Sequence, residues 1–304
     1  MIVSSLQPRS FGKNLLTDET HFGELTDSSD LLDEPVALRE RMLSDGYLFL
    51  RGFFSREAVL NVRRSVLAKM REKGLAAQSA DPLEAVALPS KPSTLLPQIA
   101  KENQSLRELL YGRRVHDFYS DLLGGEVRHF DYTWFRAIGP GKGTAPHCDL
   151  VYMGRGTRQV FTLWVPYGDT PLELGGLIVL EKSHQKGAKL RNYLSRDVDL
   201  YCSNRPGADV AKETDRLLWD GALAKNPLSL QAKLGGRWLT ADFRAGDVVT
   251  FGMTIVHGGL DNQTDRIRLS SDCRYQLASE AVDDRWVGEN PPGHSRAGKL
   301  GRVC

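Results

Sequence analysis

The stretch "TIVHGGLDNQTDRIRLSSDCRYQL", residues 254–277, has the pattern of a strand end, a polar loop and a second strand. Its middle carries glycine, aspartate and asparagine, which favour turns, and its second half alternates in polarity. His257 ends the apolar run before the loop, and Arg268 follows eleven residues later. Because successive side chains on a strand point to opposite faces, Arg268 and Ser270 would share one face of a half-buried sheet.

Four further segments show the same strand character and place most of the sheet in the second half of the chain. Each is short, β-branched or aromatic, and bounded by glycine, proline or aspartate. They cover residues 127–138, 158–167, 175–183 and 246–259. Several alternate in polarity, as the strands of a half-buried antiparallel sheet do.

The first part of the chain is rich in helix signals. Residues 34–46 form an amphipathic segment that stops at a glycine, and residues 47–54 have the apolar density of a buried strand. Ser55 is a good N-cap for a helix over 56–74, and a further helix is expected at about 105–122. Helices followed by many short strands predict an α+β protein that is mainly β, with the helices packed outside a sandwich or barrel.

Two segments interrupt this pattern. Residues 75–103 carry four prolines, which we expect to break any regular element and to leave a long surface connection or lid. Residues at about 185–240 separate the strands with a mixed, partly helical insertion. Because the later strands need the earlier helices as cover, we expect one domain over 1–304, with a core at about 36–290.

Composition narrows the class of protein. The 304 residues are 41% hydrophobic and 26% charged, and 40 basic against 38 acidic residues give a net charge of +2. Nucleic-acid and membrane-surface proteins usually carry a denser basic patch, so neither partner is expected. The N-terminus lacks the apolar core of a secretory signal, and no apolar run approaches the roughly 20 residues that span a bilayer. With four scattered cysteines, these features predict a cytoplasmic protein that acts on a small molecule.

The segment "APHCDL", residues 145–150, places His147 and Asp149 two residues apart after a glycine- and proline-rich loop. On a strand, such residues face the same side, so an imidazole and a carboxylate would lie together. His257 is the best third ligand, because it ends an apolar strand and the glycines after it let the backbone approach a metal. Two histidines and one carboxylate leave about three open positions on an octahedral metal, as in non-haem Fe(II) oxygenases.

Arg268 meets a second requirement of this chemistry. An iron of this kind needs two further electrons to cleave O₂, and a keto acid that chelates the metal supplies them. The far carboxylate of the keto acid then needs a fixed cation, for which the planar fork of arginine is well suited. Ser270 would face the same side and donate a hydrogen bond to that carboxylate. Arg266 would face that side as well, so it competes with Arg268 for the role.

These segments resemble the phytanoyl-CoA dioxygenase family. The resemblance rests on "HCD" at 147–149, "TLWVPYGDTPLELGGLIVLEKSH" at 162–184, "HGGLDNQTDRIRLSSDCRYQ" at 257–276, and the opening "LRERMLSDGYLFLRGFFSREAVLNVRR" at 38–64. It implies a double-stranded β-helix, or jelly roll, and an oxygenase that depends on Fe(II) and 2-oxoglutarate and uses O₂.

The resemblance also implies roles for individual residues. His147, Asp149 and His257 match the iron ligands. Arg268 matches the anchor of the 2-oxoglutarate carboxylate, and Trp164 matches a tryptophan near the co-substrate. The implied reaction hydroxylates an unactivated C–H bond and releases succinate and CO₂. Related halogenases have a small residue in place of the carboxylate, so Asp149 favours hydroxylation.

Several details depart from the family pattern or have a simpler interpretation. Cys148 stands where a co-substrate-binding glutamine is common, and residues 181–184 are EKSH where PGSH is usual. Trp164 has an alternative role as a core aromatic, and Ser270 as an ordinary strand hydroxyl. His184 fits a structural turn better than a ligand, and Cys148 fits an inert buried thiol.

Two other functions are compatible with the same residues. One is a jelly-roll enzyme of another type, such as a hydrolase or isomerase that binds a different metal through the triad. The other is a non-catalytic binding protein of the same fold. Arg268 has no evident duty in the first, and the complete set of three ligands argues against the second. The sequence identifies neither the substrate nor the oligomeric state.

Overall fold

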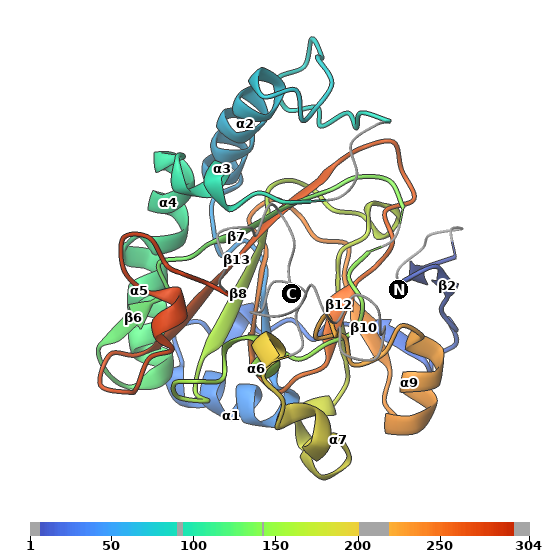
Figure 1. The fold of residues 1–304 in the computed structure, drawn as a ribbon, viewed down its shortest axis with the longest axis vertical. Coiled ribbons are helices and arrows are strands. Elements are labelled where there is room, and N and C mark those ends of the chain that lie inside the picture. The colour runs from blue at the N-terminus through green and yellow to red at the C-terminus, as the bar shows by residue number, and fades with distance from the viewer. Residues whose placement is uncertain (1–6, 90–93, 142, 201–218, 295–304) are drawn as a thin grey trace.

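Two β-sheets pack against each other at the centre of the protein (Figure 1). The computed structural model describes residues 7–89, 94–141, 143–200 and 219–294. Trp164 and Phe251 of one sheet share an apolar cluster with Val179 and Leu239 of the other. This arrangement agrees with the predicted α+β class and its jelly-roll core.

The larger sheet has strands that are all antiparallel to their neighbours. In order across the sheet they are β4 (Tyr47–Leu50), β11 (Val248–Gly252), β8 (Phe161–Pro166), β13 (Arg268–Leu277), β7 (Trp134–Ile138) and β5 (Thr94–Leu95), and β6 (Val127–His129) also pairs with β13. β13 pairs with three other strands, so its side chains lie in the middle of the sheet.

The smaller sheet brings distant parts of the sequence together. It consists of β12 (His257–Gly259), β9 (Leu177–Leu180), β10 (Trp238–Thr240) and β3 (Phe22–Glu24). β3 lies parallel to β10, and the other pairs are antiparallel. Residues ahead of the expected core therefore contribute a strand to the sheet.

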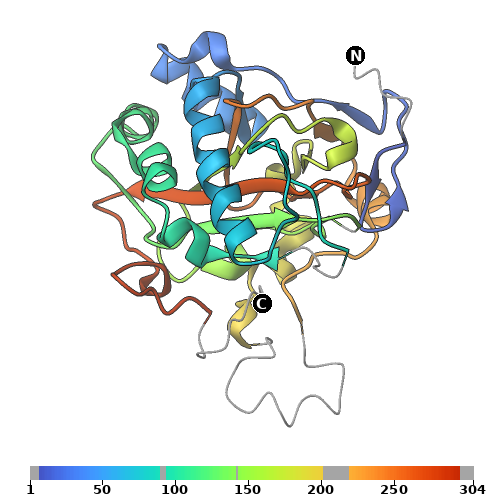
Figure 2. The ribbon, with the colours of Figure 1, turned by 90° about the horizontal axis from the view of Figure 1, so that it is seen from above.

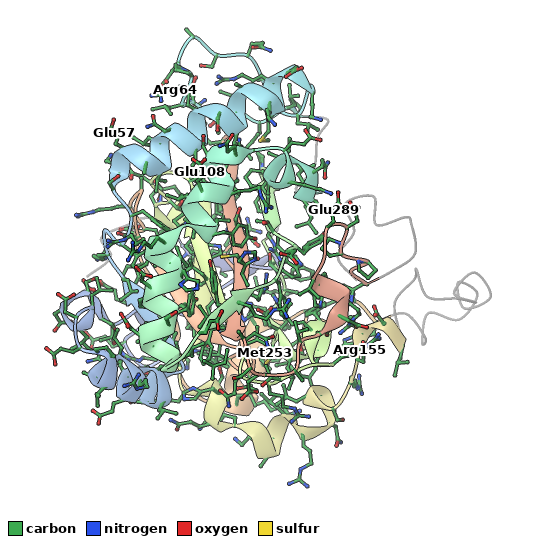
Figure 3. The ribbon with its side chains drawn as sticks, turned by 90° about the vertical axis from the view of Figure 1, so that its left-hand side faces the viewer. Glu57, Arg64, Glu108, Arg155, Met253 and Glu289 are labelled. Carbon is green, nitrogen blue, oxygen red and sulfur yellow. The ribbon has the colours of Figure 1, made fainter. Side chains whose placement is uncertain are left out.

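Helices cover the outer face of the larger sheet, as predicted. They are α1 (Pro35–Asp45), α2 (Arg56–Glu72), α4 (Gln104–Tyr111) and α5 (Arg113–Leu123). α2 crosses above β13 and buries Val59, Val62 and Val66 (Figure 2). Its outward side carries charged residues such as Glu57 and Arg64 (Figure 3). The predicted caps are present: Ser55 accepts a hydrogen bond from the N–H of Ala58, and α1 ends at a left-handed glycine.

Two expectations about residues 75–123 were wrong. The helix expected at 105–122 is divided at Gly112, whose extended backbone (ψ 170°) ends α4 and starts α5. Prolines did not exclude regular structure from residues 75–103, because β5 pairs with β7 and α3 (Pro97–Lys101) follows it. Proline at the first position of α3 is tolerated, because that N–H would lack a helical partner in any case.

Two predicted strands are interrupted. Residues 127–138 form β6 and β7, and residues 246–259 form β11 and β12 with a turn between them. His257 therefore begins a strand of the smaller sheet and does not end a strand of the larger one. In the segment 185–240 the described elements are α7 (Gly187–Leu194), a short 3-10 turn at Val198–Leu200, α9 (Pro227–Leu234) and β10; residues 201–218 lie outside the described ranges.

The remaining elements are short. β1 (Arg9–Ser10) and β2 (Lys13–Asn14) form a hairpin near the N-terminus, and α6 (Leu150–Met153) follows the "HCD" segment. Short 3-10 turns occupy Ser29–Leu31, Leu172–Leu174, Ser183–Gln185 and Asp284–Trp286. Within the described ranges, none of the helices has the length and apolar character needed to cross a bilayer.

Candidate active site

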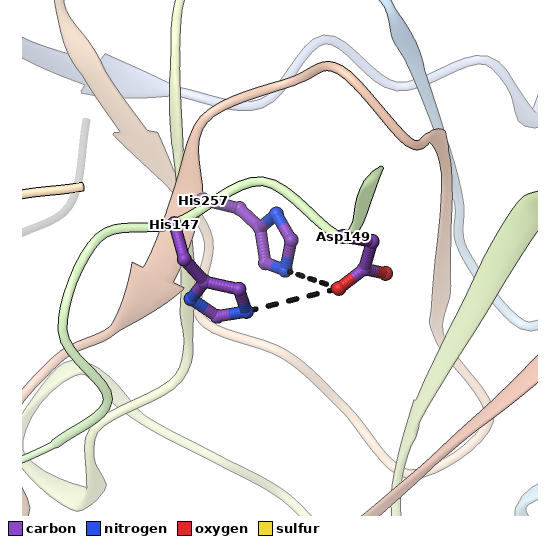
Figure 4. A group of neighbouring side chains, drawn as sticks. All are labelled: His147, Asp149 and His257. Carbon is purple, nitrogen blue, oxygen red and sulfur yellow. Dashed lines mark ion pairs between the residues drawn. The ribbon is translucent and has the colours of Figure 1, made fainter. Parts of the chain in front are cut away.

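Three potential metal ligands meet between the two sheets. His147, Asp149 and His257 are all buried, and one ligand atom from each lies within 4.8 Å of the other two. The Nε2 atoms of both histidines are 3.7 Å from Oδ1 of Asp149 (Figure 4). The structure thus brings together the three residues that the sequence predicted as a triad.

Main-chain contacts hold the two imidazoles in place. The backbone N–H groups of His147 and His257 donate to each other's carbonyl oxygens, both at 2.9 Å. The Nδ1 atoms lie 2.8 Å from the carbonyl oxygen of Ala145 and 3.2 Å from that of Ile255, respectively. Since a carbonyl can only accept, each Nδ1 carries the ring proton, and each Nε2 directs a lone pair toward the centre.

The "HCD" segment is a turn and not the strand that we expected. His147 forms an isolated bridge to His257, and Asp149 has helical backbone angles (φ −64°, ψ −24°) just ahead of α6. The two ligands therefore face the same side because the chain turns between them, and strand alternation is not the cause.

Asp149 presents a single oxygen to the histidines because its other oxygen is occupied. The hydroxyl of Thr162 on β8 donates to Oδ2 at 2.5 Å, and Arg274 on β13 donates to the same atom at 2.9 Å. Burial raises the pKa of this carboxyl, but Arg274 contributes to an opposing attraction that leaves the pKa of Asp149 below its usual value. Asp149 is therefore ionised at neutral pH, with Oδ1 available as a ligand.

Arg274 is a site residue that the sequence reasoning missed. Its side chain is 2% exposed, and its guanidinium lies 3.9 Å from the centroid of the Trp134 ring. A signal for it was present in the sequence. Arg268, Ser270 and Arg274 are separated by even numbers of residues along β13, so all three share one face of the strand.

The two histidines are in the form that binds metals. Burial lowers the pKa of His147 to about 3, an effect to which the nearby His257 adds, and burial also lowers the pKa of His257. Both imidazoles are consequently neutral at neutral pH, and neither has to lose a proton before it binds a cation.

A small inner cavity of about 30 Å³ adjoins the triad, and Arg268 and Trp164 contribute to its wall. Arg268 is 3% exposed and donates to Oγ of Ser270 at 3.1 Å, whereas its Nε has no hydrogen-bond partner among the described residues. Burial lowers the pKa of Arg268 to about 10, which still leaves the guanidinium charged at neutral pH. A buried cation with a spare donor is suited to an anionic ligand.

Arg266 lies elsewhere, although the sequence left it as a competitor of Arg268. It precedes β13, is 40% exposed, and forms an ion pair with Glu84 at 2.7 Å. Trp164 fits both of its proposed roles, because it lines the inner cavity and also packs on Phe243 with ring centroids 4.8 Å apart.

The glycines after His257 make a close backbone contact that the sequence did not predict. A Cβ at Gly258 would lie 2.8 Å from the carbonyl oxygen of Thr144, and one at Gly259 would lie 3.2 Å from the N–H nitrogen of the same residue. They therefore allow the 144–146 segment to approach β12, and so position His147. Both glycines also line the inner cavity beside the triad.

Two side chains with a simpler expected role are structural. Cys148 is fully buried, and burial raises the pKa of its thiol well above the usual range. Its Sγ points to the carbonyl oxygen of Thr254, and its N–H donates to the hydroxyl of Tyr193. His184 lies in a 3-10 turn, with Nε2 3.1 Å from the carbonyl oxygen of Leu43.

A second, larger cavity also adjoins the triad and shares part of its wall with the inner cavity. It has a volume of about 290 Å³, and its lining includes His147 and Asp149. Most of its wall is apolar or aromatic, with contributions from Leu95, Trp134, Ile138, Ala145, Tyr152 and Met153. Arg136 lines both cavities and forms an ion pair with Asp272. We call the larger space the outer chamber.

These residues fit an iron and an anionic co-substrate. Two neutral imidazoles and one carboxylate oxygen are the donor set preferred by non-haem Fe(II). Arg268, buried and with a free N–H, supplies a cation for an anionic group within the same cavity. A jelly roll with this triad and this arginine defines the class of iron- and 2-oxoglutarate-dependent oxygenases.

Comparison with known proteins places the chain within that class. The model of the phytanoyl-CoA dioxygenase family matches residues 42–270, and the chain belongs to this family. A curated relative, the 1-deoxypentalenic acid 11-beta-hydroxylase of Streptomyces exfoliatus, is 25% identical over 270 residues, which cover 84% of this chain and 86% of that protein.

Solved structures show the same fold. EctD from S. alaskensis with 2-oxoglutarate and 5-hydroxyectoine has a TM-score of 0.56 at 19% identity, and the match covers 99% of this chain and 97% of that one. The epimerase SnoN in complex with Fe3+, alpha ketoglutarate and nogalamycin RO has a TM-score of 0.56 at 21% identity, covering 88% of this chain and 98% of that one.

Proposed function

We propose that the protein hydroxylates an unactivated C–H bond of a small organic molecule, with conversion of 2-oxoglutarate and O₂ to succinate and CO₂. The observation that carries this proposal is that the triad adjoins two cavities of different character. The inner cavity contains a buried cation, Arg268, and the outer chamber is largely apolar. Such a division separates a charged co-substrate from an apolar substrate.

The proposed roles follow from the contacts of each side chain. His147, His257 and Oδ1 of Asp149 would hold Fe(II), while Arg268 would bind the distal carboxylate of 2-oxoglutarate. Ser270 holds Arg268 at 3.1 Å and would act beside it, and Trp164 would form a wall of the co-substrate site. When bound, iron and 2-oxoglutarate together supply an oxidation strong enough for an unactivated C–H bond.

The contribution of the chain to the reaction is to position the substrate and exclude water. The apolar wall of the outer chamber favours a compact molecule with few polar groups, and it would present one C–H bond to the metal side of the chamber. Exclusion of water would protect the reactive centre from side reactions. Asp149, an ionised carboxylate fixed by Thr162 and Arg274, occupies the position that must be small in a halogenase, and so favours hydroxylation.

The relative that acts on 1-deoxypentalenic acid makes cyclic terpenoid acids a reasonable first substrate class to test. Purified protein would be loaded anaerobically with Fe(II), mixed with 2-oxoglutarate and exposed to O₂ with each member of a panel of terpenoid, acyl-CoA, amino-acid and alkaloid compounds. We expect succinate release to rise with one class and the product to gain one oxygen atom. His147→Ala should abolish the release.

The same assay separates the proposal from its rivals. A hydrolase or isomerase that uses the triad with Zn or Mn would turn over its substrate without 2-oxoglutarate, and 2-oxoglutarate would not raise its melting temperature. A non-catalytic binding protein would release no succinate even slowly, and His147→Ala would change nothing. We further propose that residues 1–304 act as one catalytic domain in the cytoplasm.

A further inference from the structure

The β1–β2 hairpin contributes a side chain to the outer chamber, although it precedes the segment matched by the family. Ser10 pairs with Lys13, so the loop of the hairpin consists of Phe11 and Gly12. Phe11 lies on the wall of the chamber, whose inner end is formed by His147 and Asp149. It does not line the inner cavity beside Arg268.

The backbone of this loop is unusual for a phenylalanine. Phe11 has a φ of 49° and Gly12 a φ of 79°, as a two-residue hairpin loop with two left-handed positions requires. Asparagine or glycine is favoured at the first position, because a side chain with a bulky ring disfavours positive φ. Among the described residues, Phe11 is one of two non-glycine residues with positive φ. Local turn formation therefore does not explain the aromatic ring.

A buried aspartate fixes the loop against the chamber. Asp261 is 3% exposed, and its Oδ2 accepts the N–H of Gly12 at 2.8 Å while its Oδ1 accepts the N–H of Gly143 at 2.7 Å. The backbone N–H of Asp261 also donates to the carbonyl oxygen of Arg9 at 2.7 Å. The carboxylate of Asp261, which follows β12, thus joins the hairpin to Gly143, another residue of the chamber wall.

We infer that Phe11 is a specificity-determining residue that limits the size of the substrate, and that Asp261 is the positioning residue that holds it there. The inference rests on the proposed function, because it treats the outer chamber as the substrate site. Removal of the ring enlarges the chamber at the wall formed by the hairpin. The inner cavity, and hence the binding of 2-oxoglutarate, stays unchanged.

The test uses two apolar carboxylates of different size, 1-naphthoate and phenanthrene-9-carboxylate. Each is titrated calorimetrically into the full chain loaded with Zn(II) and 2-oxoglutarate, so that no turnover is needed. Phe11→Asn is the decisive variant, because asparagine suits the left-handed position and keeps the turn while it removes the ring. We expect it to raise the affinity for the larger acid relative to the smaller one at least tenfold. Phe11→Trp should weaken 1-naphthoate binding by a similar factor.

Two further variants separate size selection from a general loss of structure. Leu16→Asn removes an exposed apolar side chain shortly after the hairpin and should leave the affinity ratio of the two acids unchanged. Asp261→Asn, which can accept only one of the two N–H groups through its side-chain oxygen, should move the ratio in the same direction as Phe11→Asn. Rescue of the ratio by Asp261→Glu would support a positioning role.

Each outcome decides the inference. It is overturned if neither acid binds the unmodified protein, if Phe11→Asn leaves the ratio unchanged, or if Leu16→Asn shifts it equally. It is also overturned if Phe11→Asn alters the affinity for 2-oxoglutarate as much as that for the acids. Failure of the proposed function is distinct, because it appears as an absence of succinate release while acid binding still responds to residue 11.

Discussion

The two cavities beside the triad share a wall that includes His147, Asp149, Arg136 and Arg274, and differ in the parts of the chain that form the rest. Beyond the shared wall, the inner cavity is lined by residues of β8, β9, β11, β12 and β13. The outer chamber takes side chains from the N-terminal hairpin, from β5, from Ala222 in the 185–240 segment and from His294 near the C-terminus. Chemistry therefore depends on the sheets, whereas selection of the substrate depends also on peripheral segments that can change without disturbing the ligands.

Ion pairs hold the C-terminal side of the outer chamber in place. Nδ1 of His294 lies 2.9 Å from Asp199, and the same aspartate forms ion pairs with Arg285 at 2.7 Å and with Arg155 at 3.0 Å. Arg285 also pairs with the buried Asp283 at 2.6 Å. These contacts hold the segment 283–294 against the 185–240 segment. We refer to these five residues as the C-terminal clamp.

The largest effect is expected when one of the three metal ligands is removed. Asp149→Ala deletes the one oxygen that faces both histidines and removes the closer of the two carboxylates paired with Arg274. Metal affinity and activity should fall by well over the roughly 10–100-fold that is typical for loss of an outer partner of a metal ligand. Calorimetric titration with Fe(II) under anaerobic conditions measures the first quantity. His116→Ala, at an exposed histidine, is the matched control; an Asp149→Ala protein that binds Fe(II) normally would contradict the assigned triad.

Arg268 should control the co-substrate without affecting the outer chamber. Arg268→Ala removes the buried cation, for which we expect a loss of about 2–5 kcal/mol in 2-oxoglutarate binding, or roughly 30-fold and more. Arg268→Lys should recover only part of it, because lysine lacks the bidentate fork. The Michaelis constant for 2-oxoglutarate is the measurement. The exposed Arg266 provides the comparison, and an equal effect of Arg266→Ala would show that the anchor is wrongly assigned.

The groups behind Asp149 should have an intermediate effect. Thr162→Val removes the hydroxyl that donates to Oδ2, and Arg274→Gln removes the second donor, so Oδ1 is less well fixed. We expect each to lower metal affinity about 10–100-fold. Thr162→Ser should restore most of the affinity, because it keeps the donor. If the fold-loss of metal affinity in the double variant equals the product of the losses in the two single variants, the two groups do not act together on one oxygen.

The smallest effect, on the stability of the fold, should come from protonation of the carboxyl groups in the C-terminal clamp at low pH. Burial raises the pKa values of Asp199 and Asp283, but hydrogen bonds from His294 to Asp199 and from Arg285 to both outweigh it, so both pKa values lie below the usual range. A carboxyl of this kind stabilises the fold above the ordinary pKa of about 3.9, and the contribution is lost as the pH falls toward the lower value of the folded state. Unfolding in urea at pH 7 and below pH 4 measures the difference.

Asp283→Asn should reduce stability at pH 7 by about 1–3 kcal/mol and flatten this acid dependence. Asp265→Asn is the control, because Asp265 is 80% exposed and lies outside the clamp. An acid dependence that is as steep in Asp283→Asn as in the unmodified protein would contradict the assignment.

The triad and the inner cavity were largely predictable from sequence, because most of their residues belong to short sequence patterns. His147, Asp149 and His257 could be named from their spacing and surroundings, whereas Arg268 was favoured over Arg266 by the family resemblance. The reason given for the first pair was nevertheless wrong, since a turn and not a strand aligns them. Arg274 was missed because its partner, Asp149, lies 125 residues away in the sequence.

The outer chamber could not be read from the sequence in the same way. Phe11 and His294 are distant in the chain, and neither belongs to a motif. Their meeting at one cavity depends on long-range contacts, such as those of Asp261 and Asp199, which have no local signature. The prolines of residues 75–103 similarly concealed β5, whose Leu95 reaches the chamber.

The reciprocal backbone hydrogen bonds between His147 and His257 make the two ligand-bearing segments mutually dependent. Separation of these segments would break both bonds at once, and it would move apart the two imidazoles that a metal must bridge. Metal binding and the backbone pairing of these two segments should therefore be one cooperative event. Hydrogen–deuterium exchange at the backbone amides of His147 and His257 measures this event. Both rates should fall together when the metal ion is added, and the experiment requires no knowledge of the substrate.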